Sequence, residues 1–206
     1  MEMLPRLVPL LAEFDFARGR LADRLAGPEG DSGTGRRIPI PPLTDEEYLW
    51  EPVPRCWSVR PRAQGPGPGA TALLGTGDWG LAAAFPAPPS PPPFTTIAWR
   101  LGHLSALLTL RADHTVGGHS PTRDSYRFRG DAAGALASFD AGATAWREAL
   151  TSCDDAALDT VGRSTYPHGS DPEDAFIDVV WWVNQELLHH GAEIALLRDL
   201  YRETHA

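Results

Sequence analysis

Residues 181–201, WWVNQELLHHGAEIALLRDLY, lie within the longest helical pattern of the chain. Inward positions recur there at steps of three and four, which is the spacing of one buried face of an α-helix. These positions are Phe176, Val179 or Val180, Val183, Glu186 or Leu187, His190, Ile194 and Leu197. We expect the helix to start at an Asp171 cap with Pro172 in its first turn. The pattern therefore predicts a long core helix.

Three ionisable residues, Glu186, His190 and Glu193, interrupt this apolar stripe. Glu186 lies four residues before His190 and Glu193 lies three after it, so all three project from one side of the helix. Burial of a lone carboxylate is costly, so these groups must be neutralised, paired with arginine or bound to a cation. His189 is rotated by about 100° from His190 around the helix axis. It would take the place of His190 on the inward-facing stripe if the stripe is phased differently.

A second helical pattern supplies a histidine that can face this trio. Residues 95–114 open with Thr95 or Thr96 as a cap and are apolar on nearly every face, as a central bundle helix requires. Within that pattern, His103 lies among apolar neighbours on the side that also carries Trp99. A histidine opposite a Glu-x-x-x-His pair can hold a metal and leave positions for water or substrate. Imidazole and carboxylate together suit zinc, nickel, iron or manganese.

Two simpler interpretations compete with a metal site. From the residues alone, His103 is first explained as a core histidine bonded to a backbone carbonyl. The trio is equally explained as a buried ion-pair network with Arg100, Arg111 or Arg198. The remaining histidines lie in predicted loops or at helix ends, where exposure without function is the default. They are His114, His119, His168 and His205.

Two further helical patterns complete the expected fold. Residues 3–26 predict a helix that is kinked near Pro9, and residues 131–152 predict an alanine-rich helix that begins at an acidic cap. No segment shows the sustained period-two alternation of a strand. We therefore expect an all-α fold, a four-helix bundle formed by a single domain over residues 1–206.

The connections differ in composition from the helices. Residues 27–43 are rich in Gly, Pro, Ser and Arg and predict a loose loop. Thr44, with Glu47 three residues later, predicts a capping box that opens a short helix, which Pro52 stops. Residues 61–93 are a long Pro/Gly-rich connection, whose run PAPPSPPP cannot form a regular hydrogen-bonded element. Such a length indicates a lid over a site or a mobile segment.

Composition narrows the class of partner. The formal net charge of −9 would repel nucleic-acid phosphates. The chain has 2 cysteines, Cys56 and Cys153, without metal or redox spacing, so we expect ordinary reduced thiols. No run approaches the roughly 18 apolar residues needed to cross a bilayer, and no signal-peptide pattern is present. We expect a cytoplasmic protein with neither a nucleic acid nor a membrane as partner.

Several common catalytic motifs are missing from the sequence. It contains no HExxH, no GxSxG, no Walker A motif and no GxGxxG after a strand. Zincin-type proteolysis, serine-hydrolase elbows and nucleotide phosphate loops therefore lack support at the motif level.

Three motifs, in this order, resemble the DinB-like four-helix-bundle superfamily, which includes the mycothiol-dependent maleylpyruvate isomerase amino-terminal domain. They are LTDEEYLWEPVPRCWSVRP at 43–61, TTIAWRLGHL at 95–104 and NQELLHHGAEIALLRDLY at 184–201. The resemblance covers residues 5–203. It implies the same all-α bundle that the helical patterns predict.

The resemblance also implies a set of metal ligands. In that superfamily a histidine of the second helix and a pair four residues apart on the last long helix hold a divalent metal. This corresponds to His103, Glu186 and His190, with zinc or nickel as the expected ion. Glu186 stands where a histidine is commoner, as it does in the mycothiol-dependent isomerases.

Members of the superfamily with known chemistry are mostly thiol-dependent, which implies an S-transferase or isomerase that joins mycothiol or a related thiol to an electrophile. Glu193 would orient a ligand or act as a general base, and Arg198 or Arg100 would hold a thiol carboxylate. All 18 basic residues are arginine, which suggests a GC-rich genome and favours mycothiol. The alternatives are a metal-dependent hydrolase and a non-catalytic DinB-like protein that acts by binding or by forming a homodimer.

Overall fold

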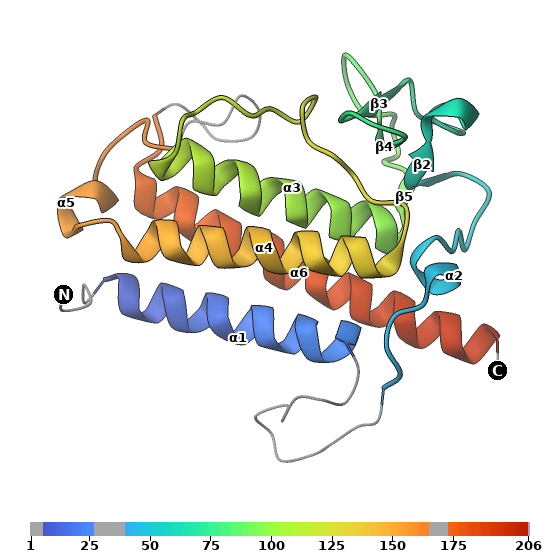
Figure 1. Ribbon diagram of the computed structural model, residues 1–206, viewed down its shortest axis with the longest axis horizontal. Coiled ribbons are helices and arrows are strands. Elements are labelled where there is room, and N and C mark those ends of the chain that lie inside the picture. Colours follow the sequence, from blue (N-terminus) through green and yellow to red (C-terminus); the bar gives the residue numbers. More distant parts are fainter. Residues whose placement is uncertain (1–5, 27–39, 165–172, 206) are drawn as a thin grey trace.

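The structure is a computed structural model that describes residues 6–26, 40–164 and 173–205. Four long helices form the body of the molecule. They are α1 (Leu7–Ala26), α3 (Ile97–Val116), α4 (Ala132–Thr151) and α6 (Phe176–Thr204). Contacts join α1 to α6, α6 to α3, α3 to α4 and α4 back to α1, and the helices run alongside one another (Figure 1). The helix patterns of the sequence are thereby confirmed. No helix in the described residues is long and apolar enough to cross a membrane.

The buried face of α6 follows the phase that the sequence predicted. Its apolar stripe is buried at Phe176, Val179, Val180, Val183, Leu187, Ile194 and Leu197. The predicted caps of the other helices are also confirmed. Thr96 Oγ1 accepts a hydrogen bond from the Trp99 amide at 3.2 Å, and Asp131 Oδ1 accepts one from the Gly134 amide at 2.6 Å.

Two helix starts differ from the prediction. The helix α1 starts at Leu7, so Pro9 lies in its first turn, where a missing amide costs no helical hydrogen bond. Asp171 and Pro172 lie outside the described residues, and residues 173–175 are not helical, so α6 starts later than predicted. A tertiary contact explains the late start, because the amide of Phe176 donates to the carbonyl of Thr160 at 3.1 Å.

Two small sheets occupy the connection before α3, and the expectation of an all-α fold without strands is wrong there. Strand β4 (Trp79–Ala83) pairs antiparallel with β2 (Val59–Pro61) and with β3 (Ala72–Leu74). Strand β1 (Cys56–Trp57) pairs parallel with β5 (Phe94–Thr95), and a 3-10 turn, η1, covers Arg62–Gln64.

The strands escaped prediction because they are 2 to 5 residues long, too short to show an alternating pattern. The Arg62 guanidinium holds the β3–β4 turn, donating to the carbonyls of Gly77 at 3.0 Å and Leu73 at 3.1 Å. Residues 86–93, the proline-rich run, contain neither helix nor strand, as expected.

Two short helices complete the described chain, α2 (Asp45–Tyr48) and α5 (Asp155–Leu158). The predicted cap of α2 is confirmed, because Thr44 Oγ1 accepts from the Glu47 amide at 3.2 Å. The thiols of Cys56 and Cys153 are free and buried, and burial raises the pKa of both. The sequence predicted ordinary reduced thiols, and the raised pKa values make both poor nucleophiles at neutral pH.

A fully buried ion pair ties α6 to α2. Arg198 has 0% of its side chain exposed and forms two hydrogen bonds to the carboxylate of Glu47, at 2.7 and 2.9 Å. The same guanidinium donates to the carbonyls of Arg24 and Pro41. One side chain thus joins α6, α2 and the end of α1, and its donors are used within the protein.

Replacement of Arg198 by alanine is expected to destabilise the fold strongly. The change leaves the Glu47 carboxylate buried without its cation, which typically costs about 3–5 kcal/mol. Urea unfolding of the purified variant measures the loss. The matched control is Arg6→Ala, which breaks an exposed pair with Asp159 and should cost far less, because water screens exposed ion pairs. Equal losses in the two variants would contradict this assignment.

Candidate metal centre

Three ionisable side chains from two helices meet between α3 and α6. Glu186 Oε2 lies 3.0 Å from His103 Nε2 and 3.5 Å from His190 Nε2. The side chains are 15%, 21% and 12% exposed for His103, Glu186 and His190, so the cluster is largely buried but reaches solvent. One ligand atom from each residue lies within 4.8 Å of the other two. The structure therefore brings together the three side chains that the sequence proposed as ligands.

Helix geometry explains the meeting. Glu186 and His190 are one turn apart on α6 and project to the same side of it. His103 comes from the face of α3 that packs on α6, and its ring lies edge-on to that of His190 with centroids 5.0 Å apart. The long-range contact between α3 and α6 thus completes a set whose other two members are neighbours on one helix.

The electrostatics favour the protonation states that bind metals. Burial opposes ionisation of Glu186, but the hydrogen bonds from His103 and His190 outweigh it and bring the pKa of Glu186 well below its ordinary value. Burial lowers the pKa of His103, against the opposing hydrogen bond from Glu186. An ionised carboxylate beside a neutral imidazole is the form in which these groups coordinate divalent cations.

The spacing of the donors also fits a small divalent ion. Donors about 2.0–2.2 Å from a tetrahedral centre lie roughly 3.3–3.6 Å from each other. The two distances between Glu186 and the histidine nitrogens, 3.0 and 3.5 Å, are close to that spacing. Two imidazoles and one carboxylate are moreover a donor set that zinc and nickel accept. The residues present therefore fit such an ion.

Glu193 lies beside the cluster and contacts its outer edge. Its Oε2 is 2.8 Å from His190 Nδ1, and its Oε1 is 3.2 Å from His189 Nε2. Oε2 also forms an ion pair with Arg100. A carboxylate on the second nitrogen of an imidazole fixes the ring and its tautomer, which leaves Nε2 directed toward Glu186.

His189 belongs to the outer edge of the cluster as well. Its side chain is 62% exposed, and its ring stacks on that of His190 with centroids 4.8 Å apart. His189, His190 and Glu193 also have donor atoms close enough for a cation. The set around Glu186 is the more buried of the two and draws on both α3 and α6.

The two arginines proposed to bind a thiol lie in different places. Arg100 is at the cluster, where it pairs with Glu193 and donates through Nε to the Thr95 carbonyl at 3.0 Å. Burial lowers the pKa of Arg100 to about 10, so it remains a cation at neutral pH. Arg198 is not at the cluster, because it is buried against Glu47. Its donors are engaged there, so the expected contact with a thiol carboxylate has no support.

The alternative interpretation of the trio as an ion-pair network with arginine holds for Glu193 and not for Glu186. Glu193 does pair with Arg100, whereas Glu186 contacts two imidazoles. Arg111 is also fully buried, but its guanidinium lies over the Trp182 ring and donates to the Ser164 carbonyl.

One histidine was wrongly expected to be exposed. His114 is buried in the last turn of α3, where its Nε2 lies 2.9 Å from the Pro121 carbonyl and its ring stacks on that of His119. The chain after α3 folds back over this turn, which the sequence did not reveal. His119 and His205 are exposed as expected, and His168 lies outside the described residues.

Two residues near the cluster received no role from the sequence. Trp99 stacks on His103, and its position four residues earlier on the same helix was the available signal. Arg123 lies in the segment after α3, and its charge contributes to the lowered pKa of His103. No local pattern marks Arg123, because only the fold brings that segment back toward α3.

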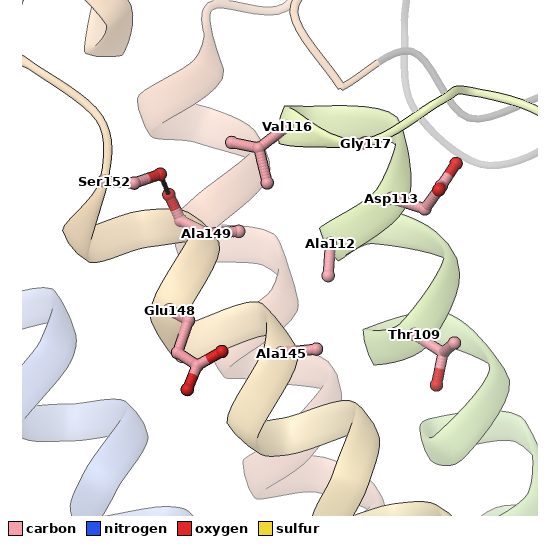
Figure 2. Close-up of a pocket in the computed structure, with 9 residues that line it drawn as sticks. All are labelled: Thr109, Ala112, Asp113, Val116, Gly117, Ala145, Glu148, Ala149 and Ser152. Carbon is pink, nitrogen blue, oxygen red and sulfur yellow. Dashed lines mark hydrogen bonds between the residues drawn. The ribbon is translucent and has the colours of Figure 1, made fainter.

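A separate surface hollow lies between α3 and α4 (Figure 2). Figure 2 shows it bordered by small side chains such as Ala112, Ala145 and Ala149, with the carboxylates of Asp113 and Glu148 on different helices. None of the cluster residues lines it. It is therefore distinct from the candidate metal centre.

Comparison with known families agrees with this architecture. A sequence model of the DinB superfamily matches residues 40–194. The chain belongs to the DinB superfamily. The range that matches DinB includes His103, Glu186 and His190, whereas Arg198 lies beyond it. A search of curated proteins and a search of solved structures returned no match.

The metal-free DinB chain is expected to lose stability as pH falls below about 6.5. Because the folded state lowers the pKa of His103, the unfolded chain takes up that proton first, and unfolding is favoured as pH falls. Urea unfolding in the presence of a chelator, between about pH 8 and pH 5, measures the slope.

His103→Gln, which keeps a donor toward Glu186, should flatten this dependence. His205→Gln, at an exposed position, is the matched control and should leave it unchanged. A His103→Gln variant with the wild-type slope would show that His103 does not contribute to it.

Proposed function

We propose that the chain binds one divalent metal ion, zinc or nickel, through His103, Glu186 and His190. The observation that carries the proposal is the convergence of the three side chains, with Glu186 Oε2 3.0 and 3.5 Å from the two imidazole nitrogens. Family membership supports it, because all three residues lie within the range that matches DinB. We further propose that the four long helices are the DinB-type bundle of a single domain.

We propose that the site serves a low-molecular-weight thiol of the mycothiol type, in an S-transferase or isomerase reaction. A divalent ion with open positions lowers the pKa of a bound thiol and so favours a thiolate nucleophile at neutral pH. The chain's own thiols do not supply that nucleophile, because Cys56 and Cys153 are buried and burial raises the pKa of both. The thiol must therefore be a co-substrate, with a small electrophile as the second substrate.

The residues around the cluster have supporting roles in this proposal. Glu193 lies 2.8 Å from His190 Nδ1 and so orients the ring with Nε2 toward Glu186 and the proposed ion. Arg100, in turn, holds Glu193 in place through their ion pair. Because both oxygens of Glu193 already have partners, orientation of His190 is better supported than the role of general base.

Elemental analysis of the purified protein tests the metal directly. We expect about one equivalent of divalent metal per chain, and loss of most of it in His103→Ala and Glu186→Gln, because each change removes one of three ligands. His205→Ala, which removes an exposed histidine at the end of α6, is the matched control and should retain the metal. A wild-type chain that folds normally and takes up no metal would favour the non-catalytic binding alternative.

Thiol chemistry is tested on the metal-loaded protein. Mycothiol should be consumed together with a chromogenic aryl halide, and the rate should fall to background in Glu186→Gln. His189→Ala, which changes an exposed neighbour of His190, should retain most of the rate. Turnover of ester or amide substrates without any thiol would instead identify a metal-dependent hydrolase.

A further inference from the structure

Trp99 lies between the candidate metal centre and the small sheet. Its indole ring stacks on the imidazole of His103, with centroids 5.2 Å apart and planes inclined by 9°. The same indole meets the ring of His190 edge-on at 6.2 Å. A single aromatic side chain therefore contacts both histidines of the cluster.

The two histidines differ in how hydrogen bonds hold them. His190 is held at both ring nitrogens, by Glu193 at Nδ1 and by Glu186 at Nε2. His103 contacts Glu186 through Nε2, and no residue in the described part of the chain hydrogen-bonds to its Nδ1. An imidazole ligand is usually oriented by a hydrogen bond at its second nitrogen. Besides Glu186 at Nε2 and the edge-on ring of His190, His103 has the stacked indole of Trp99 against its face, a contact that restrains the plane of the ring.

The sheet holds Trp99 in turn. The indole Nε1 donates to the Ala82 carbonyl of β4 at 2.9 Å. The ring of Trp57, in β1 of the two-stranded sheet, lies 6.3 Å from that of Trp99. The sheet also approaches α3 at Gly102, beside His103. A Cβ at Gly102 would lie 3.3 Å from side-chain atoms of Val59 and Phe128 and 3.5 Å from Leu81, so the sheet packs closely on α3 at this position.

We propose that Trp99 is a positioning residue that fixes the ring plane of His103, and that the sheet β2–β4–β3 holds Trp99 for this purpose. The inference rests on the proposed metal site. It adds that one ligand of this site is oriented by stacking on a side chain tethered to the strand backbone. The sheet thereby acts on metal affinity without supplying a ligand.

Zinc affinity of the full-length, metal-free protein tests the proposal, measured by competition with a chromophoric chelator. Trp99→Leu should weaken zinc binding by about 10- to 100-fold, the range found when an outer partner of a metal ligand is removed. Trp99→Phe keeps a stacking ring but loses the indole N–H, so its zinc affinity should lie between those of the wild type and Trp99→Leu. Trp181→Leu is the matched control, because Trp181 on α6 is 54% exposed, and it should bind like the wild type.

A second measurement needs no metal. In the proton NMR spectrum of the metal-free protein, the ring current of Trp99 should shift the imidazole protons of His103 upfield. Trp99→Leu should abolish that shift, and Trp99→Phe should retain part of it. Circular dichroism checks that each variant is folded.

The outcomes separate the two proposals. A wild type that binds neither zinc nor nickel overturns the metal site, whereas the ring-current shift still decides whether Trp99 orients His103. Wild-type zinc affinity in a folded Trp99→Leu variant, or an unchanged His103 shift, overturns the role of Trp99.

Discussion

The contact of Glu186 with two imidazoles is the interaction on which the candidate site depends. A carboxylate between two packed helices cannot stay ionised without partners, and His103 and His190 supply them from opposite sides of the α3–α6 contact. The same contact places two nitrogens and one oxygen at distances suited to a small cation. The same three side chains therefore compensate the buried charge of Glu186 and form the candidate metal site.

The helix α6 carries two buried charge arrangements that differ in access. Toward its end, Arg198 is fully buried and donates to Glu47 and to two backbone carbonyls, so its guanidinium is closed to a ligand from solvent. In its middle, Glu186 remains 21% exposed and contacts the imidazoles of His103 and His190, which are side chains that can bind a metal. Because it is fully buried, the Arg198–Glu47 pair has a structural role. The cluster around Glu186 is partly exposed and so remains open to a ligand.

The sequence predicted what depends on local spacing and missed what depends on distant pairing. Helical periodicity fixed the phase of α6, and with it the side on which Glu186 and His190 lie. It could not show that Arg198 pairs with Glu47, which is 151 positions away and belongs to α2. The short strands were missed because their pairing is also non-local. Such contacts exist only once the chain is folded, so no window of sequence contains them.

The sheet β2–β4–β3 links the non-local strand pairing to the candidate site. Its strands pair over only a few residues each, and the sheet packs on α3 at Gly102. The same packing brings the Ala82 carbonyl to the indole of Trp99, one helical turn before His103. The two histidines thus depend on different supports, a carboxylate of α6 for His190 and an aromatic ring tethered to β4 for His103. Loosening the sheet would therefore disturb His103 more than His190, which Glu193 also holds.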